Sequence, residues 1–230
     1  MKELAIFGST GSIGCSTLNV VRRERDRFAV SILTAGHNLQ RLTEQIREFT
    51  PRHVYILEKH DAEALREQFP GLDVYWGAEG MDAISRLTDF DIGVSALVGV
   101  AGLRPTWNMI QNGKTVALAN KEVLVAGGRL VMEAAKECRA TLLTVDSEHS
   151  AIMQCLRGEK HAEIERILLT ASGGPFFEKE ITDDITPEAA LRHPTWKMGP
   201  KITIDSATMM NKGFEVIEAR WLFNVPVEKV

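Results

Sequence analysis

The segment "LAIFGSTGSIG" (residues 4–14) constrains the fold more than any other part of the chain. A short apolar run, typical of a strand, ends in glycines at positions 8, 11 and 14, and a helical pattern begins directly after them. Such glycines allow a tight turn, close approach of the backbone to a pyrophosphate, and close packing of a helix on a sheet. The spacing is GxxGxxG rather than the commoner GxGxxG, so a purely structural turn is the alternative. Its place between strand and helix favours a dinucleotide site.

The same alternation continues along the chain. Short apolar runs are separated by segments with helical spacing of apolar residues, seen best over 40–49 and 127–138. Nearly continuous apolar strands indicate a parallel sheet covered on both faces, so we predict a doubly wound α/β domain of the Rossmann-like type. The expected strands are 4–8, 28–36, 53–57, 72–77, 91–97, 115–119, 141–145 and 166–171.

The regular alternation stops near residue 171. Glycine, proline and turn residues dominate from there to residue 200, and a helix is expected over about 205–223. We therefore predict a dinucleotide-binding domain over 1–146 and a second region over 147–230.

Composition excludes several classes of protein. The chain has 27 Lys and Arg against 31 Asp and Glu, a net charge of −4, which disfavours non-specific binding to nucleic acid or anionic membranes. No apolar run is long enough to span a membrane, and no signal or transit peptide pattern precedes the first strand. The cysteines, Cys15, Cys138 and Cys155, are odd in number and lack CxxC spacing, which indicates a reducing compartment. We expect a cytoplasmic protein.

The segment after the second strand indicates which dinucleotide is bound. It reads "TAGHNLQR" (34–41) and lacks the acid that would hold the ribose 2′-OH of NAD. Gly36, His37 and Asn38 offer donors and a small backbone, and Arg41 adds positive charge with the arginine pair at 22–23. This favours NADPH, with an ordinary surface histidine as the alternative for His37.

Two further strand ends carry polar groups where open α/β sheets bind ligands. In "ALANKEVL" (117–124) these are Asn120, Lys121 and Glu122, although a capping asparagine followed by a first-turn acid would look the same. In "TVDSEHSA" (144–151) the acids Asp146 and Glu148 flank a serine. A metal site, an acid/base pair and a helix cap all remain open there.

The second region contains a loop and a helix with unusual polar content. "HPTWKMG" (193–199) is bounded by proline and glycine and carries a tryptophan, as suits a lid over a ligand. "SGG" (172–174) is an anion-binding type of turn. The helix expected after residue 205 would be capped by Asp205 or Ser206 and would carry three close polar groups, Asn211, Lys212 and Glu215. A surface ion pair between the last two is the simpler alternative.

Taken together, "GSTGSIG", "AGHN", "LANKE", "VDSEHSA", "LTASGGPF" and "HPTWKMGPKITIDSATMMNKGFEVIEARWLF" resemble the 1-deoxy-D-xylulose 5-phosphate (DXP) reductoisomerase family. The resemblance implies an NADP-dependent oxidoreductase and isomerase of the non-mevalonate isoprenoid pathway. It would convert DXP, a phosphorylated sugar, to 2-C-methyl-D-erythritol 4-phosphate as a cytoplasmic homodimer. The implied cofactors are NADPH and Mg²⁺ or Mn²⁺, with Co²⁺ possible.

The resemblance also implies roles for individual residues. The metal ligands would be Asp146, Glu148 and Glu215, and Lys121 would join them as a catalytic residue. The substrate would contact Lys121, Ser147, Glu148, Ser172, His193, Trp196, Met198, Ser206, Asn211, Lys212 and Glu215, with a flap at about 193–200. NADPH would contact Gly8, Thr10, Gly11, Ser12, Ile13, Gly36, His37, Asn38, Asn120, Glu122 and Gly199.

The implied chemistry agrees with these residue types. Hard cations such as Mg²⁺ prefer carboxylate oxygens, and no His/Cys cluster with zinc spacing competes for a metal. The metal would polarise the substrate carbonyl during a retro-aldol cleavage and re-addition, and NADPH would then reduce the resulting aldehyde.

The sequence departs from the family in two ways. Position 37 is His where many relatives carry Lys, so recognition of the 2′-phosphate should weaken at high pH as the imidazole loses its charge. Family members also continue beyond the point matching Val230. We therefore expect an incomplete α+β catalytic region over 147–230, and an NADPH-binding fragment without turnover is the alternative function.

Two other enzyme families share single motifs with the chain. Semialdehyde dehydrogenases have a GxTGxxG turn but need a nucleophilic cysteine, and the three cysteines here lie at structural positions. Homoserine dehydrogenases share the "ANK" turn. Neither family accounts for "DSATMMNKGFE".

Overall fold

The computed structural model describes residues 1–230, which divide into two compact units, Met1–Asp146 and Ser147–Val230. The first unit is built on one seven-stranded sheet in the order β4-β3-β2-β1-β5-β6-β7, and every neighbouring pair is parallel. Its strands are β1 Lys2–Phe7, β2 Phe28–Thr34, β3 His53–Ile56, β4 Asp73–Trp76, β5 Ile92–Ser95, β6 Thr115–Leu118 and β7 Thr141–Thr144. The predicted doubly wound parallel sheet is confirmed, and its strands lie within the first seven expected segments or overlap them.

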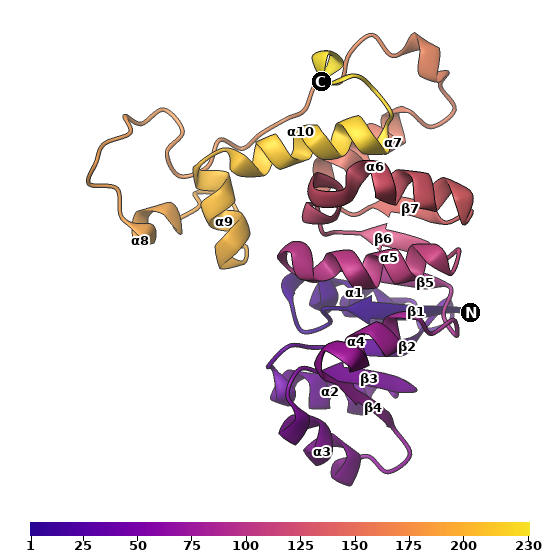
Figure 1. The fold of residues 1–230 in the computed structure, drawn as a ribbon. Helices are drawn as coiled ribbons and strands as arrows, with labels where there is room; N and C mark the ends of the chain where they lie inside the picture. The colour runs from indigo at the N-terminus through magenta and orange to yellow at the C-terminus, as the bar shows by residue number, and fades with distance from the viewer. The chain divides into compact units, whose positions relative to one another are not determined.

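Helices connect these strands on both faces of the sheet. They are α1 Ser12–Arg23, α2 Leu39–Phe49, α3 Lys59–Gln68, α4 Gly77–Ser85, α5 Leu103–Gln111 and α6 Glu122–Glu137, with a 3₁₀ turn η1 at Gly99–Gly102. Right-handed crossovers place α1, α2 and α3 on one face and α5 and α6 on the other. Helix α4 packs on α5, and α4, α5 and α6 form a row in front of the sheet (Figure 1).

The strand order reverses between β1 and β5, so this is the switch point of the sheet. The connections leaving these two strands run in opposite directions, which opens a crevice at their carboxyl ends. The glycine turn follows β1 directly, and it therefore lies at the place where this architecture binds its ligands.

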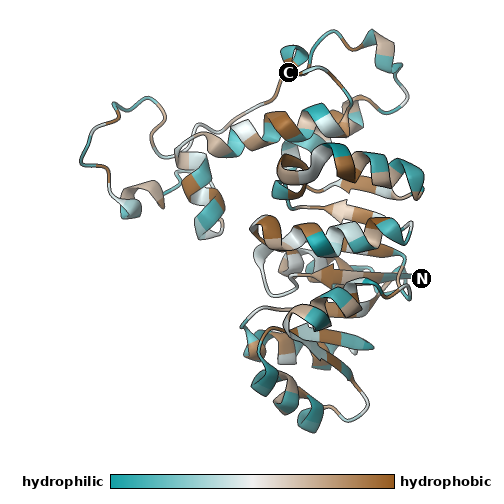
Figure 2. Cartoon of the chain, in the orientation of Figure 1, coloured by the Kyte–Doolittle hydropathy of each residue, from teal (hydrophilic) through white to brown (hydrophobic).

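The core of the first unit consists of strand residues together with the inward-facing residues of the helices that cover them. Ile6, Phe7, Ile32 and Leu33 are fully buried, and the strands are the most consistently apolar elements in Figure 2. The outer helix α3 is mostly hydrophilic there, because only Ala62 and Leu65 of its residues face the core. Each fully buried aliphatic or aromatic side chain contributes about 1.5–3 kcal/mol, and both strands and helices supply such side chains, for example Ile6 on β1 and Leu18 on α1.

A polar cluster around Asp89 connects the middle of β2 to the amino end of β3. The Oδ2 atom of Asp89 lies 3.0 Å from Arg52 Nε, 3.0 Å from His53 Nε2 and 3.1 Å from Ser31 Oγ. Burial raises the pKa of Asp89, but the hydrogen bond from Arg52 and the proximity of His53 outweigh it, and the pKa lies below its usual value.

Replacing Asp89 with asparagine should therefore cost stability in a pH-dependent way. A lowered folded-state pKa contributes stability above the unfolded-state value of about 3.9, and that contribution is lost as the pH falls through the folded-state pKa. We expect a loss of about 1 kcal/mol at pH 7, limited by solvent exposure, that disappears toward pH 2. Urea denaturation at both pH values measures it, with Glu63→Gln of the exposed Lys59–Glu63 pair as the control. An equal loss at both pH values would contradict the assigned role.

The second unit contains helices and no strand. Its elements are α7 Ser147–Cys155, η2 His161–Glu163, α8 Pro187–Ala190, α9 Pro200–Ala207, α10 Met210–Leu222 and η3 Val227–Lys229. The strand predicted over 166–171 is wrong for this chain. The N–H of Ile167 donates to the carbonyl of Lys229 at 2.7 Å, but no neighbouring strand continues the pairing. An apolar run without a partner cannot form a ladder, and Leu168 is 78% exposed.

The sequence predicts one helix over 205–223, but the structure has two helices in this region, α9 and α10. Helix α9 ends at Ala207, and Met209 interrupts the chain with a left-handed backbone conformation, φ 60°, before α10 begins. Asp205 and Ser206 consequently lie within α9, so the prediction that one of them caps the following helix is also wrong. No helix in either unit has the length and apolar character to cross a membrane.

Candidate functional site

Hydrogen bonds connect the glycine turn to Thr34 at the end of β2. The N–H of Gly8 donates to Thr34 Oγ1 at 2.9 Å, and the N–H of Ser9 donates to the carbonyl of Thr34 at 2.8 Å. The buried amide of Gln45, on α2, donates to the carbonyl of Ser9 at 2.9 Å, and the Ser9 hydroxyl lies 2.7 Å from Gln45 Oε1. Sequence reasoning missed Gln45, although an amide within the apolar stripe between Leu42 and Ile46 is a signal for a buried polar contact.

The glycines hold this turn in a crowded place. Gly8 has a φ of +93°, and a Cβ there would lie 2.6 Å from the carbonyl oxygen of Ala96. A Cβ on Gly14 would lie 2.3 Å from the carbonyl oxygen of Gly8. Ser12 and Ile13, by contrast, are exposed and begin α1, so their N–H groups lack partners within the helix. The turn therefore presents N–H donors at a helix N-terminus, the arrangement that binds phosphate.

Asn120 joins the ends of β5 and β6. Its Nδ2 donates to the carbonyls of Leu97 and Gly99, both at 2.7 Å, and its Oδ1 accepts from the N–H of Val123 at 3.2 Å. Its side chain thus bonds an N–H in the first turn of α6, although the N-cap residue of that helix is Lys121. Glu122 follows as the first residue of α6. The same side chain also fixes the loop after β5, beside the glycine turn.

A buried ion pair lies at the ends of β6 and β7. Lys121 is 7% exposed, and its Nζ lies 2.8 Å from Asp146 Oδ2. The two strands are parallel neighbours, so residues that follow their carboxyl ends meet at the same edge. The first unit thus holds the Lys121 ammonium group beside the Asp146 carboxylate.

In the second unit, α7 and α10 bring two carboxylates together. Oxygens of Glu148 and Glu215 lie within 4.8 Å of each other. Lys212 Nζ donates hydrogen bonds to both carboxylates, at 3.2 Å to Glu148. It also donates to the carbonyl oxygen of Thr170. Asn211 Nδ2 donates to Glu215 Oε1 at 2.6 Å. Because Glu215 is only 1% exposed, the Lys212–Glu215 contact is not the surface ion pair of the simpler interpretation.

Glu148 is held in its ionised form. Burial raises the pKa of its carboxyl group, but the Ser147 hydroxyl donates to it at 2.6 Å, and a backbone N–H and Lys212 also favour the anion, so its pKa lies below the usual value. Two adjacent carboxylates with hard oxygen donors fit a divalent cation of the Mg²⁺ or Mn²⁺ type. Residues in the second unit thus supply two of the three expected metal ligands side by side.

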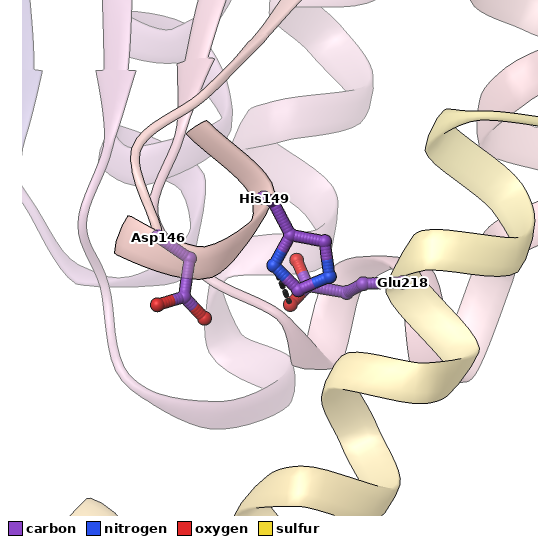
Figure 3. Close-up of side chains that lie close together, drawn as sticks. All are labelled: Asp146, His149 and Glu218. Carbon is purple, nitrogen blue, oxygen red and sulfur yellow. Dashed lines mark ion pairs between the residues drawn. The ribbon is translucent and has the colours of Figure 1, made fainter. Parts of the chain in front are cut away.

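A buried histidine links α7 to α10 behind these carboxylates. His149 is fully buried, with Nε2 2.9 Å from the carbonyl oxygen of Glu215 and Nδ1 3.8 Å from Glu218 Oε2. Figure 3 shows its ring extending from α7 toward Glu218 on α10. The ring also stacks on Phe223. His149 therefore sets the spacing of the helices that carry Glu148 and Glu215. Sequence reasoning overlooked Glu218, three residues after Glu215.

A small polar pocket adjoins the carboxylates. Its volume is about 30 Å³. It is lined by Glu148, Ala171, Ser172, Gly173, Ser206, Met209, Asn211 and Lys212. Two hydroxyls, an amide and an ammonium are groups that bind phosphate oxygens. Gly174 allows the 172–174 loop to approach α9, because a Cβ there would lie 2.7 Å from the carbonyl oxygen of Ser206.

The expected flap residues are only partly associated with this pocket. His193 Nε2 lies 3.2 Å from Ser172 Oγ, and its Nδ1 accepts from the N–H groups of Thr195 and Trp196. Trp196 is 60% exposed, and neither it nor Met198 lines the pocket. Gly199 precedes α9 as its N-cap. The structure thus brings His193 to the Ser172 side of the pocket but does not place the other flap side chains in its lining.

The fold and these sites define an α/β protein with a dinucleotide-binding architecture, joined to a unit that carries paired carboxylates and a phosphate-type pocket. Two family models match it. The 1-deoxy-D-xylulose 5-phosphate reductoisomerase model matches residues 4–128, and the model of the C-terminal domain of that enzyme matches residues 142–223. The chain therefore belongs to the 1-deoxy-D-xylulose 5-phosphate reductoisomerase family.

Individual relatives agree with this membership. The chain is 54% identical to the reductoisomerase of Prosthecochloris aestuarii and 52% identical to that of Thermoanaerobacter pseudethanolicus. Each match covers 100% of this chain and 61% of the relative, so the chain spans about three fifths of their length.

Solved structures give the same result. A DXP reductoisomerase in complex with NADPH, fosmidomycin and magnesium has a TM-score of 0.93 at 38% identity, covering 100% of this chain and 60% of that one. The Zymomonas mobilis enzyme in complex with NADPH has a TM-score of 0.90 at 41% identity, with 99% and 60% covered.

Proposed function

We propose that this protein acts as an NADPH- and divalent-metal-dependent reductoisomerase that converts DXP to 2-C-methyl-D-erythritol 4-phosphate. The observation that carries the proposal is the pair of carboxylates, Glu148 and Glu215, held together by Lys212 beside a phosphate-type pocket. Related structures bound to NADPH, fosmidomycin and magnesium support it. In this proposal residues 1–146 bind the cofactor and 147–230 bind metal and substrate, within a cytoplasmic homodimer.

The cofactor would lie along the carboxyl edge of the sheet. The N–H groups at Thr10–Ile13 would bind the pyrophosphate at the start of α1, as helix N-termini bind anions. Gly36, His37 and Asn38 would bind the adenosine end after β2, and Asn120 and Glu122 the segment after β6. Gly199 is a further proposed contact. Asn120 supports this arrangement because it already fixes the loop after β5.

Asp146, Glu148 and Glu215 would hold the metal, with Mg²⁺ or Mn²⁺ as the preferred ion. When bound, the ion would polarise the substrate carbonyl as a Lewis acid. The Lys121 ammonium, already paired with Asp146 at 2.8 Å, would stabilise negative charge on a substrate oxygen. Ser147 would contact the same end of the substrate.

The phosphate of the substrate would occupy the pocket of the second unit. Ser172, Ser206, Asn211 and Lys212 would donate hydrogen bonds to its oxygens, and His193 would support Ser172. Trp196 and Met198 would close over the substrate and exclude water from the reactive fragments, which requires the flap to move because Trp196 is exposed.

Removing a carboxylate should abolish turnover without disturbing the cofactor. We expect Asp146→Asn and Glu215→Gln each to lower metal-dependent NADPH oxidation with DXP by at least about a hundredfold, because a metal ligand matters at least as much as the groups that orient it. NADPH affinity, measured by fluorescence, should stay unchanged, while Mn²⁺ affinity, measured by electron paramagnetic resonance, should fall. Asp205→Asn, a carboxylate paired with Lys201 on α9, is the control. Normal turnover in both variants would rule out the metal-site assignment.

The second candidate is an NADPH-binding chain without turnover. It is favoured by one observation, the coverage of only about 61% of the length of the relatives. The same assay separates the two candidates. A flat absorbance trace with DXP and Mn²⁺, together with intact NADPH binding, would support binding alone, whereas metal-dependent oxidation would support the reductoisomerase.

A further inference from the structure

Glu218 is a buried carboxylate on α10 to which none of the proposed metal or substrate contacts assigns a role. Its exposed fraction is 3%, and it lies three residues after Glu215, so both acids are on the inward-facing side of the helix. A carboxylate in a protein interior is costly unless a partner compensates for the lost water, and an apolar side chain of similar size would fill the position at lower cost. Packing alone therefore does not account for an acid at this position.

Glu218 contacts His149, which comes from the other helix of the pair. Nδ1 of His149 lies 3.8 Å from Glu218 Oε2, within ion-pair range (Figure 3). Nε2 lies 2.9 Å from the main-chain carbonyl oxygen of Glu215. A carbonyl oxygen only accepts hydrogen bonds, so Nε2 must carry a proton and donate it to this contact. Because the partner of one ring nitrogen determines whether the other is protonated, Glu218 keeps His149 in the tautomer and orientation that bind the main chain of Glu215.

The position of His149 in the chain connects both carboxylates of the candidate metal site. His149 directly follows Glu148 on α7, and it bonds the main chain of Glu215 on α10. Stacking on Phe223, with ring centroids 6.2 Å apart, further restricts the imidazole. One side chain thus joins the backbone segments that carry the two carboxylates. A rotated ring would change the separation of their oxygens, whereas a bound metal needs its ligands within about 0.2 Å of their ordinary distances.

We propose that Glu218 is a positioning residue for the metal site, because through His149 it holds Glu215 beside Glu148 in the arrangement that binds a divalent cation. The inference rests on the proposed function, since it concerns the same metal site. Residues that orient metal ligands without touching the ion typically change metal affinity by about 10- to 100-fold when they are removed. The role requires a polar group that fixes the ring and not a negative charge as such. A glutamine amide can also fill it, because its NH₂ group can donate to Nδ1 of the neutral ring.

The test measures metal affinity and stability separately in the whole chain. Dissociation constants for MnCl₂ are measured by electron paramagnetic resonance, and urea midpoints are measured in EDTA. Glu218→Met should weaken Mn²⁺ binding about 10- to 100-fold, and Glu218→Gln should weaken it less than about threefold. The double variant His149→Phe, Glu218→Met should lose Mn²⁺ affinity like Glu218→Met but keep its urea midpoint. Replacing both partners of a buried polar contact by apolar groups of similar shape is nearly neutral for stability. Glu163→Met, at an exposed acid paired with Lys160, is the control and should change neither quantity.

Each other outcome would overturn the inference or the function beneath it. Equal loss of Mn²⁺ affinity in Glu218→Gln and Glu218→Met would assign the effect to the charge of Glu218 and refute the positioning role. Unchanged affinity in Glu218→Met, with or without a lower urea midpoint, would show that the contact with His149 serves the fold alone. If Glu218→Met did not fold, the affinity of the double variant would decide the question. An unmutated chain whose Mn²⁺ binding is not weakened by Glu215→Gln would refute the metal site itself, which is a different result from an unchanged affinity in Glu218→Met.

Discussion

Replacing Lys212 with methionine should destabilise the metal-free chain by about 3 kcal/mol, the cost of breaking a largely buried ion pair. The ammonium lies between Glu148 and Glu215, and Glu215 is 1% exposed. Without Lys212, two carboxylate groups with oxygens within 4.8 Å of each other would lose their shared cation. The Asn211 amide would remain on Glu215, but a neutral donor cannot offset the repulsion between two anions.

Mn²⁺ should restore most of this stability. A divalent cation can replace the ammonium between the two carboxylates, and a ligand that binds only the folded state stabilises it by mass action. In the unmutated chain the gain should be smaller, because Lys212 already neutralises the acids. Urea denaturation in EDTA and in millimolar MnCl₂ measures both effects. Lys160→Met, from the exposed Lys160–Glu163 pair, should lose less than about 1 kcal/mol under either condition. A loss for Lys212→Met that Mn²⁺ left unchanged would contradict a metal site at these carboxylates.

The sequence was most informative where local patterns determine structure. Seven parallel strands could be predicted because a strand covered on both faces needs a continuous apolar run, as "LAIF" shows. The run over 166–171 looks the same, yet it forms no strand, because pairing depends on a neighbour that no local pattern encodes. The break at Met209 also escaped prediction. A left-handed methionine carries no glycine or proline signal, and tertiary packing must impose it.

The candidate site could be predicted only in part for the same reason. Glu148 and Glu215 are 67 residues apart, and periodicity alone cannot place them side by side. Only the resemblance to a family suggested it, and the metal and substrate roles remain proposals. Buried polar contacts were missed altogether, such as Gln45 with Ser9 and His149 with Glu218. Each partner looks unremarkable in its own segment, because the need for a hydrogen bond arises only when the fold removes both from water.

Alanine at Gly14 and alanine at Gly11 should have different effects, the first on folding and the second on cofactor binding. At Gly14 the new Cβ would lie 2.3 Å from the carbonyl oxygen of Gly8 and 2.5 Å from the Cα of Ser9. Both neighbours are backbone atoms of the turn that cannot rotate away, so the turn and α1 would have to separate. We expect Gly14→Ala to cost about 3 kcal/mol or more, the upper range for overpacking, and to yield little folded protein. Thermal unfolding and the yield of soluble chain measure this effect.

Gly11 is the matched position, because alanine there should keep the fold and lose the cofactor. Its backbone, φ −78° and ψ 176°, suits any residue, and the nearest atom to a new Cβ would be the Gly8 oxygen at 3.4 Å. Stability should change by less than about 1 kcal/mol. NADPH affinity should fall at least about tenfold, because the methyl group would keep the pyrophosphate from the N–H groups of Ser12 and Ile13. Unchanged NADPH affinity in a folded Gly11→Ala chain would show that the turn serves packing alone. Tight packing at Gly14 with open space at Gly11 is what a turn needs if it is both structural and phosphate-binding.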